Sequence, residues 1–280
     1  MGGTLYIVGT PIGNLEDLSP RAARIFSEVD FIAAEDTRVT LKLLSHLGIH
    51  KPLVSYYEHN RAASGEKILS RLLGGESCAL VTDAGMPAIS DPGEDLVRLC
   101  AENGVTVTAA PGPSALVTAM AVSGMPSGRF CFEGFLSRAP RSRREHLESL
   151  KNEERTMIFY EAPHKLLYTL RDMYACWGNR RLALCRELTK LHEELVRTDL
   201  EHAVERYSLE EPRGEFVLVI EGAAGEPRED AGEDAVAFAR KLARDGLSLK
   251  DAAKQASERF RTPRNGVYAA LLAEKRAAEE

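Results

Sequence analysis

The stretch VTDAGMPAISDPG, residues 81–93, lies between an apolar run of strand length and the helical-looking segment EDLVRLCAENG, residues 94–104. Its thirteen residues include two aspartates, two prolines and two glycines, a composition typical of a loop that a ligand approaches closely. It matches neither the G-x-G-x-x-G nor the G-x-x-x-x-G-K-S/T phosphate-binding pattern. The stretch therefore predicts a strand-to-helix loop that holds something other than a dinucleotide or a triphosphate.

Two further turns rich in glycine and proline follow predicted strands, GTPIGN at residues 9–14 and APGPSA at residues 110–115. In open parallel sheets ligands collect beyond the carboxyl ends of the strands, so these loops predict one shared site. Each loop taken alone is also compatible with a plain tight turn. Backbone groups at close range together with carboxylates favour a small cationic ligand.

Apolar runs of strand length alternate with helical segments along the first half of the chain, which predicts a largely parallel α/β sheet. The predicted strands are residues 4–10, 30–34, 78–82 and 105–110. The pattern restarts near residues 125–128 with a second series of strands, and a polar linker at residues 223–234 precedes helical segments. We expect domains at residues 1–124, 125–224 and 230–280, the last of them a small helical domain with a helix-turn-helix-like order.

The composition indicates a globular, mildly acidic protein of 280 residues with a net charge of -6 and 44% hydrophobic residues. That balance argues against a generally basic surface for nucleic acid, although a local cluster of Lys and Arg would still attract phosphates. Five scattered cysteines without a C-x-x-C pair predict reduced thiols rather than a zinc site or a disulfide framework. No apolar run approaches bilayer length, so we expect a cytoplasmic protein without a membrane partner.

Seven motifs occur in a characteristic order: GTPIGNLEDLSPRA, AAEDTR, TDAGMPAISDPG, PGPSA, FEGFL, YEAPHK and RELTKLHEE. In this order they resemble the ribosomal RNA small subunit methyltransferase I family, within the tetrapyrrole methylase superfamily. The resemblance implies a dimeric fold of two α/β domains with S-adenosylmethionine in the cleft between them. It also implies 2′-O-methylation of a cytidine, cytidine 1402, in the decoding region of 16S rRNA within the small ribosomal subunit.

The resemblance also implies a set of cofactor-binding residues, carried over position by position. They are Pro11, Asp83, Ala84, Gly85, Ile89, Ser114, Ala115, Tyr160 and Ala162. Small residues among them would let main-chain groups reach the cofactor, and Asp83 could accept hydrogen bonds from its polar groups. The chain departs from the family pattern at Met86 and at residues 197–199, which leaves the shape of the cofactor loop and the far edge of the cleft open.

Methyl transfer to a ribose hydroxyl requires alignment and a proton acceptor, but no metal, because a sulfonium is already an activated electrophile. The candidates for handling the proton are Glu35, Asp36 with its neighbour Arg38, Glu133, Glu187 and Lys190. Structural roles compete with these assignments. Glu133 could make a hydrogen bond at a strand end, and Asp36 with Arg38 could form a turn cap and its ion pair.

A cluster of arginines follows FEGFL and is the candidate phosphate-binding patch: Arg138, Arg141, Arg143 and Arg144. Taken alone, such a charge run also fits a solvated helix face. The helices near residues 248–272, with Arg259, Arg261 and Arg264, resemble a helix-turn-helix-like tail that contacts either RNA or the partner subunit. Two rival functions are a tetrapyrrole methyltransferase with a deep apolar acceptor pocket and a non-catalytic RNA-binding assembly factor.

Overall fold

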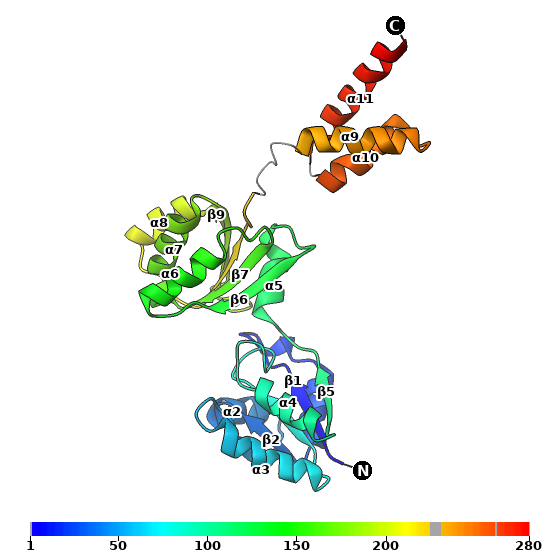
Figure 1. Ribbon diagram of the computed structural model, residues 1–280. Coiled ribbons are helices and arrows are strands. Elements are labelled where there is room, and N and C mark those ends of the chain that lie inside the picture. Colours follow the sequence, from blue (N-terminus) through cyan, green and yellow to red (C-terminus); the bar gives the residue numbers. More distant parts are fainter. Residues whose placement is uncertain (1, 225–230, 261, 280) are drawn as a thin grey trace. The chain divides into compact units, whose positions relative to one another are not determined.

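The computed structural model describes residues 2–224, 231–260 and 262–279 (Figure 1). The chain divides into two compact units, Met1–Ala223 and Ala224–Glu280. Residues 225–230 of the expected linker lie outside the described part, whereas residues 231–234, also expected in the linker, belong to a helix. Within the described residues, no helix is both long and apolar enough to cross a membrane.

The first sheet consists of parallel strands in the order β3-β2-β4-β1-β5. Its strands are β1 (Thr4–Val8), β2 (Phe31–Ala34), β3 (Leu53–Ser55), β4 (Cys78–Val81) and β5 (Thr106–Ala110). The sequence predicts all of these except β3, whose three residues are too few to show a periodicity. Because β1 pairs with both β4 and β5, the loops after these strands leave one edge of the sheet side by side.

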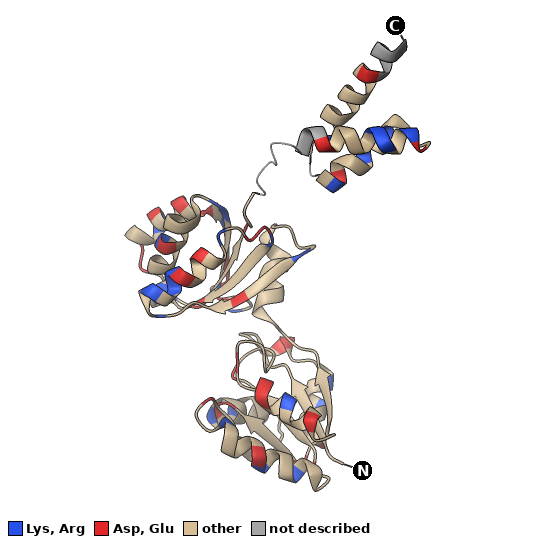
Figure 2. Cartoon of the chain, viewed as in Figure 1, with Lys and Arg blue, Asp and Glu red and all other residues tan. Residues whose placement is uncertain are grey.

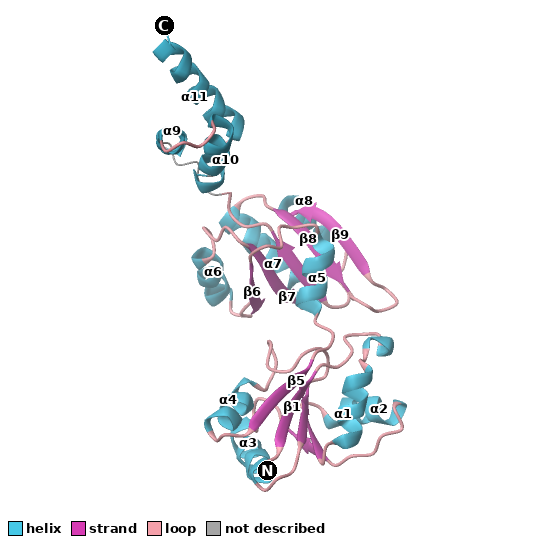
Figure 3. Ribbon diagram, turned by 90° about the vertical axis from the view of Figure 1, so that its right-hand side faces the viewer, coloured by secondary structure: helices cyan, strands magenta, loops and turns pink. Residues whose placement is uncertain are grey.

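Helices cover both faces of the first sheet (Figure 3). One face packs against α1 (Pro20–Glu28) and α2 (Thr37–His46), and the other packs against α3 (Arg61–Leu73) and α4 (Glu94–Glu102). Helix α1 begins as the sequence predicts, with Pro20 in its first turn and the Ser19 hydroxyl accepting a hydrogen bond from the Ala22 N–H at 3.1 Å. The short 3₁₀ helix η1 (Leu15–Asp17) lies in the loop between β1 and α1.

The second sheet is mixed and has the order β6-β7-β10-β8-β9. Strands β6 and β7 are parallel, while β10 runs antiparallel to both β7 and β8, and β9 runs antiparallel to β8. The strands are β6 (Phe130–Phe135), β7 (Thr156–Glu161), β8 (Arg181–Arg186), β9 (Glu194–Asp199) and β10 (Phe216–Ile220). The charged edge strand β9 was not predicted, because its sequence ELVRTD lacks the apolar run of the others.

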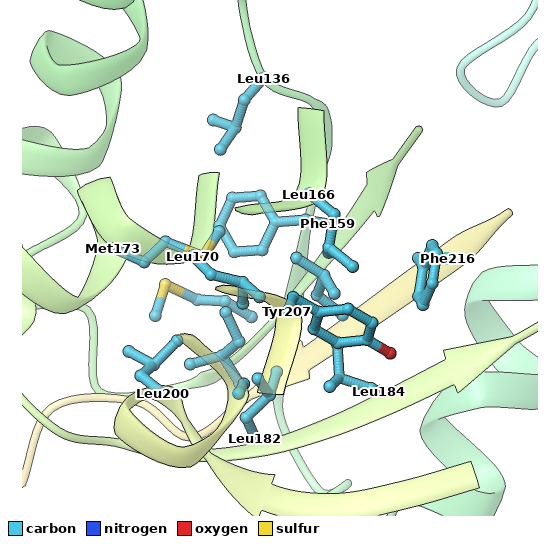
Figure 4. Packing of buried hydrophobic residues seen from close by; sticks show 14 of the residues in the cluster. Leu136, Phe159, Leu166, Leu170, Met173, Leu182, Leu184, Leu200, Tyr207 and Phe216 are labelled. Carbon is cyan, nitrogen blue, oxygen red and sulfur yellow. The ribbon is translucent and has the colours of Figure 1, made fainter. Parts of the chain in front are cut away.

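One face of the second sheet carries the larger hydrophobic core, which Figure 4 shows around Phe159, Leu170 and Tyr207. Helices α6 (Pro140–Ser149), α7 (Pro163–Trp177) and α8 (Leu200–Leu209) supply its other side. The opposite face packs against α5 (Ala115–Ser123), whose Leu116 and Met120 share a cluster with strand residues of this sheet. The predicted fold class, two α/β sheets followed by helices, is confirmed.

Helix α5 connects the two sheets, because it begins directly after the loop of β5 and packs on the second sheet. Its last turn is held by Arg197, which donates hydrogen bonds to the carbonyl oxygens of Val122 at 2.6 Å and Ser123 at 3.0 Å. A cation at a helix C-terminus also interacts favourably with the helix dipole. The structure thus gives Arg197, one of the departures from the family pattern, a structural role. The expected boundary at residue 124 stays a prediction.

The described residues of the second unit form three helices, as the sequence predicts. They are α9 (Ala231–Arg244), α10 (Leu249–Phe260) and α11 (Arg264–Glu279). Buried alanines of α9 and α10 pack with Val267 and Leu271 of α11 into a small core. The side chain of Arg259 lies over the ring of Phe238, 4.6 Å from its centroid, Arg264 is exposed, and Arg261 lies outside the described residues.

Candidate functional site

A cavity of about 480 Å³ lies at the carboxyl-terminal edge of the first sheet and is closed on its other side by residues of the second sheet. Most of the predicted cofactor-binding residues line it: Asp83, Ala84, Gly85, Ile89, Ser114, Ala115, Tyr160 and Ala162. Pro11 does not line the cavity, and its neighbour Ile12 does. The structure therefore brings residues from three loops and a distant strand together in one place.

The loops after β1, β4 and β5 touch through their backbones. The N–H of Thr10 donates to the Gly85 carbonyl at 2.9 Å, and the Gly85 N–H donates to the Thr10 carbonyl at 3.1 Å. A Cβ atom on Gly9 would lie 2.7 Å from Gly112 Cα, and a Cβ on Gly112 would lie 2.7 Å from Gly9 Cα. Both positions require glycine, because the neighbouring atoms are backbone atoms that cannot rotate away.

The loop at residues 81–93 contains a run of left-handed backbone conformations. Gly85 has a φ of 87°, Ala88 of 67°, Ser90 of 65° and Gly93 of 144°. This region is unfavourable for residues with a side chain, and such strain often concentrates at functional sites. The resulting turns place Ile89, together with residues 90 and 91, on the wall of the cavity.

Carboxylates from two first-sheet loops gather on this wall. The N–H of Asp83 donates to Glu35 Oε2 at 3.4 Å, and the N–H of Asp36 donates to Asp83 Oδ1 at 3.1 Å. Burial raises the pKa of Glu35 and that of Asp83 above their ordinary values. Burial, reinforced by the charges of Glu35 and Asp83, raises the pKa of Asp91 to about 7.

Asp91 is a wall residue that the sequence analysis did not single out, although it lies in the opening stretch. Other wall residues that the sequence analysis did not single out include Phe135 and Glu161. The available signal for Asp91 was its place in a loop already assigned to the site. Its burial among other acids depends on the loop after β2, which no local pattern reveals.

The second-sheet wall is aromatic and fixed. The Tyr160 hydroxyl accepts a hydrogen bond from the Leu116 N–H at 3.1 Å, and its ring centroid lies 4.9 Å from that of Phe132 and 5.5 Å from that of Phe135. Burial raises the pKa of Tyr160 above its ordinary value. Tyr160 thus stays a neutral phenol that anchors the first turn of α5 beside the cavity.

Glu161 follows Tyr160 and is held by several donors. Lys165 Nζ lies 2.8 Å from Glu161 Oε1, the Ala162 N–H donates to the same oxygen at 2.9 Å, and the Thr169 hydroxyl donates to Oε2 at 2.6 Å. The side chain of Glu161 is 1% exposed and that of Lys165 is 13% exposed. This pair is a buried, fully hydrogen-bonded structural unit at the base of α7.

Among the residues expected to handle a proton, the cavity receives Glu35 and Lys190 but not Asp36, Arg38, Glu133 or Glu187. Asp36 caps α2 and pairs with Arg38 at 2.6 Å, so hydrogen bonds from Arg38 lower the pKa of Asp36 to about 2. Glu133 lies 3.1 Å from the ring of His146. Asp36 and Glu133 therefore make the structural contacts that compete with a role in proton transfer.

The loop after β8 carries Lys190 to the cavity wall. Lys190 Nζ donates to Glu187 Oε1 and to Glu215 Oε2, both at 2.9 Å. Burial by itself would raise the pKa of Glu187, but the Glu215 N–H and Lys190 together hold it below the ordinary value. A Cβ on Gly13 would overlap Lys190 Cγ, so this loop touches the loop after β1.

The arginines after FEGFL lie in and just before helix α6, on which Figure 2 shows blue residues, and they differ in exposure. Arg138, Arg141 and Arg144 are exposed, and the last two form ion pairs with Glu145 at 2.8 Å and with Asp172 at 3.3 Å. Arg143 instead is 7% exposed and pairs with Asp172 at 2.7 Å. The expectation that Arg143 belongs to an exposed patch is thereby corrected, because the helical turn of α6 points this side chain at α7.

Comparison with known proteins places these features in a family. The profile described as Tetrapyrrole (Corrin/Porphyrin) Methylases matches residues 4–204. A ribosomal RNA small subunit methyltransferase I from Synechocystis sp. is 47% identical over 268 residues, covering 95% of this chain and 96% of the relative. The protein of the same name from Halalkalibacterium halodurans is 51% identical over 220 residues, covering 79% of this chain and 76% of the relative.

Solved structures show the same fold at much lower identity. The uroporphyrin-III C-methyltransferase of Thermus thermophilus, complexed with S-adenyl homocysteine, superposes with a TM-score of 0.55 at 17% identity, covering 80% of this chain and 98% of that one. At this identity the likeness shows the fold alone. The family comes from the matched profile and from the close relatives, and it confirms the resemblance predicted from the ordered motifs. The chain belongs to the ribosomal RNA small subunit methyltransferase I family of tetrapyrrole methylases.

Proposed function

We propose that this protein transfers a methyl group from S-adenosylmethionine to the ribose 2′-hydroxyl of cytidine 1402 in 16S rRNA. The observation that carries the proposal is the cavity in which loops of the first sheet meet Tyr160 and Ala162 of the second. Family membership supports methyl transfer to ribosomal RNA, the reaction for which the relatives are named. The choice of ribose and of this cytidine follows the motif resemblance.

The residues around the cavity fit S-adenosylmethionine. A volume of about 480 Å³ falls within the range of about 300–1,000 Å³ typical of small-molecule sites. The wall combines Gly85 and three alanines, which expose main-chain groups, with Asp83 and Glu35, which would complement a cation. The residues that would hold the cofactor are Asp83, Ala84, Gly85, Ser114, Ala115, Tyr160 and Ala162.

The bound cofactor supplies an activated methyl group on a cationic sulfur. The protein then has to hold the ribose hydroxyl in line with that methyl group, exclude water and receive a proton. Positioning alone can lower the barrier by about 7–11 kcal/mol at best. Tyr160, fixed by Leu116 and by its aromatic neighbours, provides a rigid and water-excluding wall for this alignment.

The RNA would meet the exposed arginines Arg138, Arg141 and Arg144 near the start of α6. Their guanidinium groups are suited to phosphate contacts, which position RNA without reading its sequence. Arg143 is left out of this surface because it is buried against Asp172. A homodimer acting in the cytoplasm on 16S rRNA or the small subunit completes the proposal, and sedimentation of the purified chain tests its oligomeric state.

The decisive experiment incubates the full chain with labelled S-adenosylmethionine and small subunits from a strain that lacks the modification. Nuclease digestion and nucleoside mapping then locate the label. We expect it on the 2′-oxygen of cytidine 1402 and nowhere on subunits that already carry the methyl group. Label on a base would reject the ribose assignment, and label on added uroporphyrinogen instead of RNA would favour a tetrapyrrole methyltransferase.

A further inference from the structure

Asp91 occupies an unusual position on the cavity wall. It follows Ser90, whose φ is 65°, and precedes Pro92 and Gly93, whose φ is 144°. A Cβ on Gly93 would lie 2.9 Å from Leu80 Cδ2, so the loop is packed tightly on β4. The strained backbone on either side of Asp91 therefore fixes the position of its carboxylate.

The carboxylate of Asp91 also lacks polar partners. In the described part of the chain, no hydrogen bond or ion pair reaches it, whereas Glu35, Asp83, Glu161 and Glu215 on the same wall each accept at least one hydrogen bond. A half-buried acid without a partner lowers the stability of the folded protein, so its presence calls for a functional explanation. An acid of this kind in a cleft is typical of a group that exchanges a proton.

We propose that Asp91 is the proton acceptor for the ribose 2′-hydroxyl, an inference that rests on the proposed function of the same cavity. As the 2′-oxygen forms its bond to the methyl carbon, the carbon–sulfur bond breaks and leaves its electron pair on sulfur. The hydroxyl proton passes to a carboxylate oxygen of Asp91. The sulfur thereby becomes neutral, the ribose gains a methyl ether, and the proton later leaves Asp91 for solvent.

The environment of Asp91 supports this role. Burial and the charges of Glu35 and Asp83 raise its pKa to about 7, and a base whose pKa lies near the working pH transfers protons most effectively. Tyr160 faces Asp91 from the second sheet and is affected by its charge. The other titratable groups on the cavity wall are Glu35, Asp83, Glu161, Cys185, Lys190 and Glu215.

The other acids near the cavity are less suited to accept the proton. Asp36 and Glu187 are held ionised by Arg38 and Lys190, which lowers their basicity. Glu161 is enclosed by Lys165 and the Thr169 hydroxyl. Glu35 and Asp83 already accept backbone hydrogen bonds from each other's loops. Within the described residues, Asp91 is thus the carboxylate on the wall that accepts no hydrogen bond and forms no ion pair.

The test compares the full-length protein with Asp91→Asn and Asp91→Glu in single-turnover methylation of unmodified small subunits across pH 5.5–9. We expect Asp91→Asn to lower the rate constant by about 10²-fold or more. It should also abolish the fall in rate below neutral pH that protonation of Asp91 causes in the parent. Asp91→Glu should restore part of the rate. Asp95→Asn, on α4 and outside this cavity, is the matched control.

Calorimetric titration with S-adenosylhomocysteine separates proton transfer from cofactor binding. The inference predicts that Asp91→Asn changes its Kd by no more than about threefold. A loss of affinity that accounts for the whole loss of rate would overturn it, as would an Asp91→Asn variant that keeps the parent rate and pH profile. Failure of the parent protein to label any ribose would instead refute the proposed function, before the variants are compared.

Discussion

The acids at the two walls of the cavity differ in how their charges are balanced. On the first-sheet wall, Glu35, Asp83 and Asp91 have no ion pair within the described residues, and burial raises the pKa of each. On the second-sheet wall, Glu161 pairs with Lys165, and Glu215 pairs with Lys190. Paired acids keep a fixed charge and hold elements together, while unpaired ones can change protonation during a reaction.

The supply of bases to each wall explains this difference. Lys165 lies four residues after Glu161 in the chain, and Lys190 reaches Glu215 from 25 residues away. In the first sheet, Arg38 lies close to the acids of its loop but forms its ion pair with Asp36, at 2.6 Å, and not with a wall acid. The loop at residues 81–93 contains no Lys or Arg. The first-sheet wall therefore keeps an uncompensated negative charge suited to a cationic cofactor.

The largest effect on stability is expected from Lys165→Met, which leaves Glu161 charged and buried without its cation. Breaking a buried pair from one side costs about 3–5 kcal/mol of unfolding free energy. Denaturant unfolding of the full chain at pH 7 measures it. The double variant Glu161→Gln/Lys165→Met should recover part of the loss, because no buried charge remains. A cost below about 1 kcal/mol for Lys165→Met, the level of an exposed pair, would contradict the description of this wall as locked.

The next effect concerns the backbone contact that shapes the first-sheet wall. Gly112→Ala would place a Cβ 2.7 Å from Gly9 Cα, so the loops after β1 and β5 must separate. We expect a loss of about 1–3 kcal/mol in stability, as for other overpacked sites, together with weaker binding of S-adenosylhomocysteine by calorimetry. Gly128→Ala is the control, because nothing lies within 4 Å of a Cβ at that position. Equal behaviour of the two variants would show that the close approach is dispensable.

Asp91→Asn is expected to have a smaller effect on stability, and to stabilise the folded protein rather than destabilise it. The pKa of Asp91 is raised from 3.8 to about 7, so between these pH values the folded chain binds more protons than the unfolded one. The contribution of Asp91 to the free energy of unfolding is therefore most favourable at low pH and decreases as the pH rises toward 7. Asp91→Asn should therefore be more stable than the parent by about 1–2 kcal/mol at pH 8, after discounting for partial exposure. The two should be equal near pH 4.

Thermal unfolding of both proteins at pH 4 and pH 8 measures this difference. Each kcal/mol corresponds to about 2–4 °C in Tm for a domain of this size. A stability gain confined to high pH would sharpen the contrast with Glu161, whose charge is balanced by Lys165. An Asp91→Asn protein that is less stable at both pH values would mean that the carboxylate is held by a partner after all.

The smallest effect on stability is expected at the exposed arginines. Replacing Arg138, Arg141 and Arg144 by Gln should change unfolding free energy by less than about 0.5 kcal/mol per site, because exposed ion pairs contribute little. The same variant should weaken RNA binding and reduce the slope of log K against log salt by about 2, if each arginine contacts one phosphate. Neutralising Arg24 and Arg98, exposed on other helices, is the control. An unchanged slope would exclude this patch from the RNA surface.

Arg143→Gln tests the correction made for the fourth arginine. Its side chain is 8% exposed and pairs with Asp172, whose side chain is 15% exposed. We expect a loss of stability of about 1–3 kcal/mol, above that for its exposed neighbours but below that for Lys165→Met, because Asp172 keeps its ion pair with Arg144 at 3.3 Å. The same denaturant experiment measures it. If Arg143→Gln lowered the free energy of unfolding as little as Arg141→Gln does, Arg143 would have to be counted among the exposed arginines.

Much of the architecture could be predicted from local sequence. Ser19 and Pro20 mark the start of α1, and the glycines of GTPIGN and APGPSA mark turns that only small residues allow. Strands β2, β4 and β10 are apolar runs buried on both faces, which are readable without a structure. Strands β3 and β9 were not predicted, because β3 is very short and β9 is a charged strand at the edge of its sheet. The ordered motifs also identified the family.

The sequence by itself determined most of the strands and helices along the chain, the loops that line the cavity and the family, because these depend on neighbours along the chain. The tertiary structure alone decided which charges are free. Arg143 and Arg144 are adjacent in sequence, yet one is buried against Asp172 and the other is exposed. Asp91 is perturbed by Glu35, which is far away in sequence and is brought close by the pairing of β2 with β4. Burial and charge balance are sums over residues distant in the chain, so only the folded arrangement fixes them.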